Sequence, residues 1–261
     1  MTRALRAEWT KLRTVNSTGF ALGLALALMV LLSALNGAES ETSGCPPSGC
    51  DEDIVVNSLA GVYFAQFAVI ALAVMAIGSE YGTGLIRVTL VADPRRRVVL
   101  LAKALAVGAA VFAVGLVASV LSFEIATSLL AGNGFNATNG YREWSLTDPE
   151  ALRAVGGTAV YLVALALLSL GIAALLRHTA AAISTVTALL AVPLMIAELL
   201  PERIADRVVQ VSPMTAGLSI ERTVDRADSV PIDPWVGLGI ACLWALAAMA
   251  AALWLVGRRD A

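Results

Sequence analysis

Residues 154–176 read AVGGTAVYLVALALLSLGIAALL, a run without a single charged side chain. A helix that crosses about 30 Å of hydrocarbon needs about 20 such apolar residues. Five further stretches reach or approach this length, and the six together cover residues 17–35, 56–78, 104–131, 154–176, 180–200 and 235–256. With 58% hydrophobic and 15% charged residues, the composition is far from that of a soluble protein. We therefore predict an all-α, polytopic membrane protein whose six transmembrane helices form one domain over residues 1–261.

Positive charge falls on alternate connections between these spans. Twelve of the 18 Lys and Arg residues would lie on one side of the membrane. They are Arg3, Arg6, Lys11, Arg13, Arg87, Arg95, Arg96, Arg97, Lys103, Arg177, Arg258 and Arg259. Because positively charged loops resist translocation, this side is expected to be cytoplasmic, with both termini on it. The Arg-rich, Lys-poor usage is typical of a bacterial protein, so we expect a multi-pass protein of the bacterial plasma membrane.

The segment before the first span has the spacing of an amphipathic helix. Leu5, Trp9 and Leu12 recur at i, i+4 and i+7, and the cations of this segment occupy the other faces. This pattern predicts a short helix over residues 2–14 that lies in the cytoplasmic interface, beside anionic lipid. The alternative interpretation is simple topological anchoring.

The three cysteines divide between two environments on this topology. Cys45 and Cys50 fall in the first external loop, where disulfides persist, and we expect a bridge between them. Cys242 lies inside the sixth span and is interpreted as a small apolar residue. We expect no metal site, because the single histidine, His178, lies on the opposite side and a paired-cysteine zinc site needs two more ligands.

The connection after the second span is the most distinctive stretch. Residues 78–90 read GSEYGTGLIRVTL, and residues 93–97 read DPRRR. The glycines allow a sharp turn as the chain leaves the membrane, and residues 85–90 can form a short helix that stops before Pro94. The pattern predicts a charged elbow that projects into the cytoplasm. An ordinary positive-inside loop is the alternative.

Small residues recur every four positions in three of the spans. Such a face lets helix backbones approach closely in a membrane, so it predicts helix contacts within or between subunits. The residues are Gly19, Gly23 and Ala27 in the first span, Gly115 and Ser119 in the third, and Gly237, Ala241 and Ala245 in the sixth.

Three cytoplasmic segments together resemble a known family. Residues 4–13 read ALRAEWTKLR, residues 80–87 read EYGTGLIR, and residues 94–97 read PRRR and lead into Ala102 and Lys103. This combination, with six spans and the elbow after the second, resembles the type-2 class of ABC transporter permeases, particularly those common in actinobacteria. The resemblance covers essentially the whole chain, although only the cytoplasmic motifs are distinctive.

The resemblance implies specific sites. In that family the elbow is a coupling helix that docks on a separate ATPase subunit. By resemblance, the residues that contact or brace the ATPase are Glu80, Tyr81, Gly84, Ile86, Arg87 and Arg95. The second and fifth spans line the substrate path, which implies Tyr63, Phe64, Gln66, Phe67, Ser184, Thr187 and Met195. The external gate follows the fifth span, which implies Val208, Val209 and Met214. Plain helix packing remains an alternative for the residues of the path.

The chain carries no phosphate-binding loop of its own. Its only lysines, Lys11 and Lys103, are followed by Leu and Ala, and neither completes a Gly-x-x-x-x-Gly-Lys-Ser/Thr motif. ATP and Mg²⁺ are therefore expected in a partner subunit, and this chain is expected to hold no cofactor and to be no enzyme. Coupling to an ion gradient is poorly supported, because Glu124 and Glu198 fall near the external ends of their helices.

These observations predict the permease subunit of an ABC exporter. It would work as a homodimer, or as a heterodimer with a similar permease, bound to two ATPase subunits and in contact with membrane lipid but not with nucleic acid. The cargo would be hydrophobic or amphiphilic, such as a drug, antibiotic, lipid or peptide. A non-transporting assembly factor or sensor is the alternative. An intramembrane enzyme is disfavoured, because no catalytic set of residues falls at membrane depth.

Overall fold

The computed structural model describes residues 2–40, 42, 52–82, 95–224, 232–256 and 258. Throughout these residues the regular structure is helical. Within these described residues, six helices are long and apolar enough to cross a membrane, as the sequence predicts. They are α2 (Asn16–Glu39), α4 (Val62–Gly82), α6 (Arg96–Gly132), α7 (Pro149–Leu176), α8 (Thr179–Ala197) and α11 (Pro234–Val256). This is the architecture of a multi-pass membrane protein.

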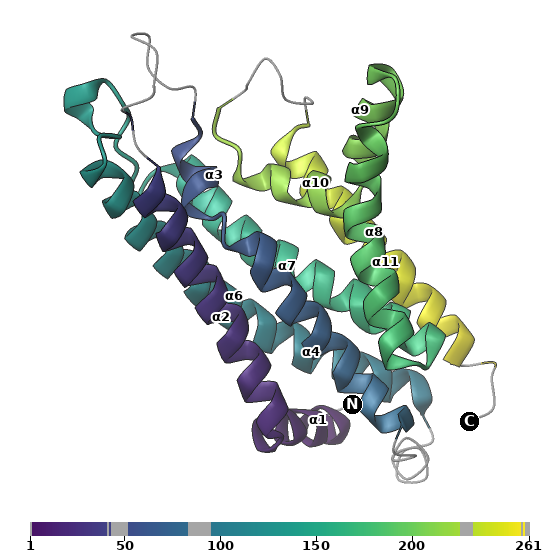
Figure 1. The fold of residues 1–261 in the computed structure, drawn as a ribbon. Coiled ribbons are helices and arrows are strands. Elements are labelled where there is room, and N and C mark those ends of the chain that lie inside the picture. The colour runs from purple at the N-terminus through teal and green to yellow at the C-terminus, as the bar shows by residue number, and fades with distance from the viewer. Residues whose placement is uncertain are drawn as a thin grey trace.

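The long helices run up and down and so define two ends of the molecule (Figure 1). We call one the α1 end, because α1 (Thr2–Thr14) lies crosswise there; α2 and α6 begin at this end, and α4 and α11 finish at it. The other, the α9 end, holds the short elements. These are α3 (Ile54–Ser58), η2 (Ala137–Asn139), α9 (Glu202–Val211), α10 (Pro213–Leu218) and η3 (Ser219–Glu221).

Helix α7 forms the centre of the bundle. It packs against α4, α6, α8 and α11, and Tyr161 and Leu170 are among its fully buried side chains. Its neighbours approach closely through small residues: Gly115 of α6 faces Ala159 and Leu162 of α7. The uncharged run of residues 154–176 is thus the segment that other helices cover most completely.

The predicted small-residue faces have different outcomes. Gly115 and Ser119 are buried between α6 and α7, and Gly237, Ala241 and Ala245 are buried on α11, so both faces make helix contacts. In α2, by contrast, nothing lies within 4 Å of a Cβ built on Gly19 or Gly23. The buried face of α2 runs instead through Ala21, Ala25, Met29 and Ser33.

The predicted and observed spans differ most at the starts of the second and third spans. The second span begins at Val62 rather than residue 56, because Asp53 caps the separate helix α3 and the chain then turns at Gly61. A Cβ on Gly61 would overlap the backbone of Met29, so the turn lies directly against α2. The third span begins at Arg96, about two turns before residue 104.

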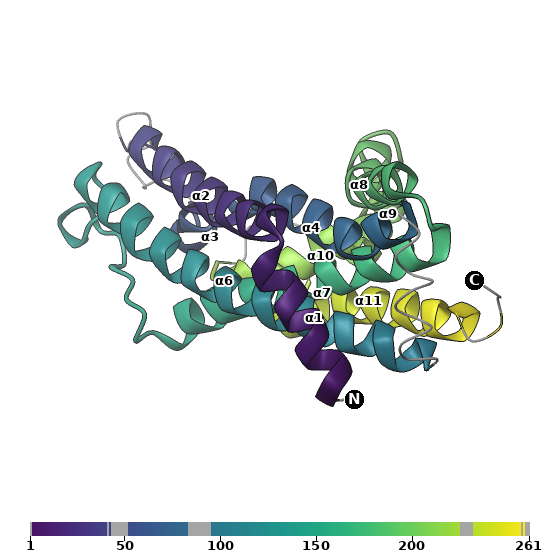
Figure 2. The ribbon, with the colours of Figure 1, turned by 90° about the horizontal axis from the view of Figure 1, so that it is seen from below.

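The helix predicted over residues 2–14 is present as α1 (Thr2–Thr14). Seen from below, it crosses the end of the bundle under α6 (Figure 2). Several other predictions fall outside the described residues: the elbow with Gly84, Ile86 and Arg87, and the bridge between Cys45 and Cys50. The side chain of Tyr81 is likewise outside them, whereas Cys242 is a free, half-buried thiol.

Candidate functional site

Four charged side chains meet at the α1 end, among them both lysines of the chain. Glu8 and Lys11 come from α1, Glu80 from the end of α4, and Lys103 from the second turn of α6. The Lys103 Nζ atom lies 2.6 Å from Glu8 Oε2 and 3.0 Å from Glu80 Oε1. The Lys11 Nζ atom lies 2.8 Å from Glu8 Oε1 and 2.8 Å from Glu80 Oε1. We call these four residues the ion cluster.

The ion cluster is largely shielded from solvent. Glu8, Glu80 and Lys103 are 4%, 7% and 4% exposed, and only the side chain of Lys11, at 42%, reaches the surface. Carboxylates and ammonium groups are almost never buried unless they are paired. With two acids and two bases, the cluster has no net charge, which makes its burial possible.

The carboxylates and ammonium groups of the ion cluster keep one another ionised. Burial alone would raise the pKa of Glu8, but the ammonium groups of Lys103 and Lys11 outweigh it and hold that pKa below its usual value. Burial alone would lower the pKa of Lys11, but the carboxylates of Glu8 and Glu80 raise it above its usual value. These two residues of α1 therefore stay ionised at neutral pH.

The arrangement follows from the positions of the four residues. Glu8 and Lys11 are three residues apart, so they share one face of α1. That face lies against α6, which brings the pair to Lys103 and to the last turns of α4. The ion cluster therefore joins α1 to both helices that flank residues 83–94, the segment of the predicted elbow.

The cluster only partly matches the predicted coupling residues. Glu80 is in it, paired with lysines, whereas Arg95 is exposed and directly precedes the first residue of α6. Sequence reasoning missed Glu8, Lys11 and Lys103 as partners of Glu80. One signal was available. The chain has only two lysines, and each lies in one of the cytoplasmic segments that carry the family resemblance.

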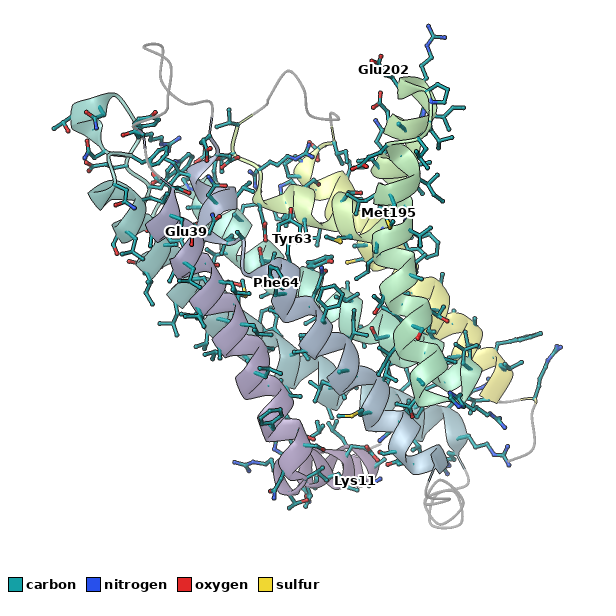
Figure 3. The ribbon with its side chains drawn as sticks, viewed as in Figure 1. Lys11, Glu39, Tyr63, Phe64, Met195 and Glu202 are labelled. Carbon is teal, nitrogen blue, oxygen red and sulfur yellow. The ribbon has the colours of Figure 1, made fainter. Side chains whose placement is uncertain are left out.

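The predicted path residues of α4 and α8 lie on two helices that contact each other. Tyr63, Phe64 and Phe67 are 39%, 55% and 44% exposed on α4, and Met195 is 67% exposed on α8. Figure 3 shows Tyr63, Phe64 and Met195 in the half of the bundle nearer the α9 end. Ser184 of α8 is exposed and Thr187 is half-buried. The structure thus leaves aromatic and thioether side chains uncovered along these helices.

Gln66 does not share this exposure. It is 1% exposed, and its Oε1 atom accepts a hydrogen bond of 2.8 Å from the hydroxyl of Tyr161. Its Nε2 atom donates to the carbonyl of Tyr63 at 3.0 Å and to the sulfur of Met214 at 3.7 Å. A predicted path residue and a predicted gate residue are thereby in contact. Sequence reasoning missed Tyr161, whose apolar surroundings give no hint of this partner.

The other predicted gate residues lie on α9. Val208 and Val209 are half-buried there, as is Met214 on α10. Glu124 and Glu198 are exposed on α6 and at the end of α8.

Another buried acid lies beside α10, at the α9 end. Glu221 is 1% exposed and accepts a hydrogen bond of 2.6 Å from the hydroxyl of Thr158 on α7. Burial raises the pKa of Glu221 to about 8; the bond from Thr158 opposes this shift, and the nearby charge of Asp53 adds to it. No lysine or arginine of the described residues forms an ion pair with Glu221.

Asp53 fixes the segment that follows Glu221. Its carboxylate caps α3 through the backbone N–H groups of Val55 and Val56. The same carboxylate accepts hydrogen bonds of 2.6 Å from the N–H of Thr223 and 3.0 Å from that of Val224. Residues 223 and 224, which follow η3, are therefore held against the start of α3.

Comparison with known families gives no match to any family model, and comparison with curated proteins gives none either.

Proposed function

We propose that this chain is the membrane-spanning permease subunit of an ATP-driven ABC exporter. It works as a dimer with a second copy of itself or a similar permease, and two separate ATPase subunits bind the ATP and Mg²⁺. The ATPase docks on the elbow between α4 and α6. The observation that carries this proposal is the ion cluster, which ties α1 to the two helices that leave and enter the elbow.

The ion cluster suits a part that transmits force. A loop that only sets topology needs no buried charges, and buried ion pairs contribute little net stability compared with apolar packing. Their effect is to fix one arrangement, because a shift of α1 relative to Glu80 or Lys103 would leave a buried charge unpaired. A push on the elbow would therefore move α1, α4 and α6 as one body.

Helix α4 connects the elbow, where the ATPase would dock, with the proposed external gate. Glu80 lies near one end of it, in the ion cluster, and Gln66 lies near the other, in contact with Met214 of α10. Because a helix is stiff along its axis, displacement at the elbow would reach α10. In this proposal α10 belongs to the external gate.

The cargo is hydrophobic or amphiphilic in this proposal. The exposed side chains of α4 and α8, such as Phe64 and Met195, offer aromatic and thioether contacts. A facing permease would enclose them as a path through the membrane.

The proposal also sets the orientation. The α1 end carries Arg6, Arg13, Arg96 and Arg97 in addition to the ion cluster. Under the positive-inside rule this end faces the cytoplasm of the bacterial cell, where the ATPase has access to it.

Purification of the tagged, full-length chain from its host in mild detergent tests the proposal. We expect an equimolar P-loop ATPase in the eluate, lost on Arg87→Ala and retained on Arg203→Ala, which alters an exposed arginine of α9. Glu80 is less suited to this test, because its replacement also disturbs the ion cluster. Recovery of the chain alone would favour the non-transporting assembly or sensor role. Recovery of the ATPase with both variants alike would contradict docking through Arg87.

A further inference from the structure

A cavity of about 390 Å³ opens beside the ion cluster. Four helices line it: α1, the first turn of α2, the last turns of α4 and the first half of α6. Lys11, labelled on α1 in Figure 3, is one of the lining residues. Sites for small molecules and cofactors have volumes of about 300 to 1,000 Å³, so this cavity is large enough for part of a ligand of that size.

The lining divides into a charged part and an apolar part. All four residues of the ion cluster contribute to it. The rest of the lining is mainly apolar and includes Leu12, Leu72, Met75, Ala76 and Val107. A ligand that fills such a cavity must combine a polar head with a hydrocarbon portion, which is the definition of an amphiphile.

The ion cluster has an unused hydrogen-bond acceptor on Glu80 and an unused donor on Lys11. Both lysines converge on Oε1 of Glu80, while Oε2 of the same carboxylate is buried and has no hydrogen-bond partner among the described residues. The ammonium of Lys11 has three N–H donors, and two of them are used, on Glu8 and Glu80. A ligand that completes the cluster would therefore donate to Glu80 and accept from Lys11.

We propose that this cavity binds an amphiphile whose head group joins a primary ammonium to a phosphate. The ammonium would donate to Glu80, the phosphate would accept from Lys11, and the hydrocarbon would lie along Leu72 and Met75. Phosphatidylethanolamine has this chemistry. Binding of this kind does not rest on the proposed function, because it needs no ATPase and no transport.

Related lipids separate the features of this head group. Phosphatidylcholine has the same charges, but its trimethylated ammonium has no N–H to donate. Phosphatidylglycerol keeps the phosphate and lacks the cation. Free phosphoethanolamine has the complete head group without the hydrocarbon, so it distinguishes a soluble source of the ligand from a membrane source.

Native mass spectrometry of the full-length chain in detergent tests the proposal. The probes are the dioleoyl forms of phosphatidylethanolamine, phosphatidylcholine and phosphatidylglycerol. We expect phosphatidylethanolamine to bind about tenfold more tightly than either other lipid, since a hydrogen bond between charged groups is lost with each. Equal binding of the three lipids would overturn the proposal and leave the ATPase test of the proposed function untouched.

Free phosphoethanolamine identifies the source. If it fails to displace the bound lipid at equal concentration, the ligand is a membrane lipid held also by its hydrocarbon. If it displaces the lipid fully at equal concentration, the hydrocarbon contributes nothing to binding, the head-group site serves a soluble ligand, and the assignment of an amphiphile is overturned.

Two matched substitutions locate the site. Ala76→Phe fills the apolar part of the cavity without changing the ion cluster, and we expect it to abolish the lipid preference. Ala109→Phe makes the same change in the separate groove that Leu5 and Trp9 of α1 form with α6, and we expect it to keep the preference. A preference that survives Ala76→Phe would contradict the assignment. The lipid comparison on the unaltered chain holds even if this variant does not fold.

Discussion

Lys103 is a buried cation that depends on acidic partners from two other helices. It is 4% exposed, in a helix long and apolar enough to span a membrane, and its ammonium contacts Glu8 and Glu80. A buried lysine without such partners would be strongly unfavourable. The charge of Lys103 therefore makes the positions of α1 and α4 interdependent.

Replacement of Lys103 by methionine tests this dependence. Lys103→Met keeps an unbranched side chain but leaves Glu8 and Glu80 to share Lys11. We therefore expect the free energy of unfolding to fall by about 3–5 kcal/mol. Thermal unfolding in detergent micelles measures the change. Arg97→Met, an exposed position of the same helix, should change stability by less than about 0.5 kcal/mol. Equal effects of the two substitutions would show that the ion cluster does not hold the helices together.

Glu221 predicts a dependence of stability on pH. Its pKa is raised from 4.5 to about 8 in the folded chain, so the folded state keeps a proton that the unfolded state releases. The contribution of this proton to the stability of the folded state is complete below about pH 4.5 and is lost as pH rises towards about 8. The free energy of unfolding falls over this range by no more than about 1.4 kcal/mol per pH unit.

The matching substitution is Glu221→Gln. It keeps an oxygen that accepts from Thr158 and removes the titration, so the melting temperature of this variant should fall less between pH 5 and pH 8 than that of the unaltered chain. Glu202→Gln, on the exposed surface of α9, should leave the pH profile unchanged. An unaltered profile in Glu221→Gln would contradict the assignment of a protonated Glu221.

Sequence reasoning reached these residues only in part. By resemblance it placed Glu80 among the residues that contact or brace the ATPase. The structure pairs Glu80 with Lys11, 69 residues away in the chain, and with Lys103. For α1, the pattern singled out the apolar residues Leu5, Trp9 and Leu12. It did not identify Glu8, which is buried against the bundle in contact with Lys103, because apolar spacing does not show where a charged side chain finds its partner.

At the scale of elements, α10 and η3 are the most closely fitted pieces. They lie against α7 and α11, and the contacts run through glycines. A Cβ on Gly217 would overlap the ring of Tyr161, and one on Gly237 would overlap the carbonyl oxygen of Ala216. Any side chain at these positions must displace the short helices that carry Met214 and Glu221.

Two alanine substitutions in α11 test this fit. Gly237→Ala should destabilise the protein by about 1–3 kcal/mol, because the added methyl meets the backbone of α10. Gly239→Ala lies two residues further on, where nothing lies within 4 Å, and should stabilise α11 by up to about 1 kcal/mol through helix propensity. Thermal unfolding of both variants under identical conditions measures the difference. Two stabilising substitutions would contradict the close contact.

The number of spans was predictable, because long apolar runs are a property of composition. Their boundaries were less so: α3 interrupts the second predicted span through the cap at Asp53 and the contact of Gly61 with α2. The small-residue pattern identified the contact faces of α6 and α11. Nothing among the described residues lies within 4 Å of a Cβ built on Gly19 or Gly23 of α2, so a contact of that face with a second subunit stays a prediction.

On the scale of the whole molecule, α4 links the two ends. Its 21 residues correspond to about 30 Å of helix, with the ion cluster at one end and the contacts of Gln66 towards the other. Helix α1 closes the first end, and α10 and η3 pack against the central helix α7 at the second (Figure 1). This arrangement provides one stiff route from the elbow to the proposed gate.

The central claim, that the elbow contacts an ATPase, is tested most directly by site-specific photo-crosslinking in the living host. A photoreactive amino acid replaces Ile86 in the elbow or, as the control, Val208 of α9 at the opposite end of the molecule. We expect a P-loop ATPase to be cross-linked from position 86 and not from position 208. No ATPase at position 86, or the same proteins at both positions, would contradict it.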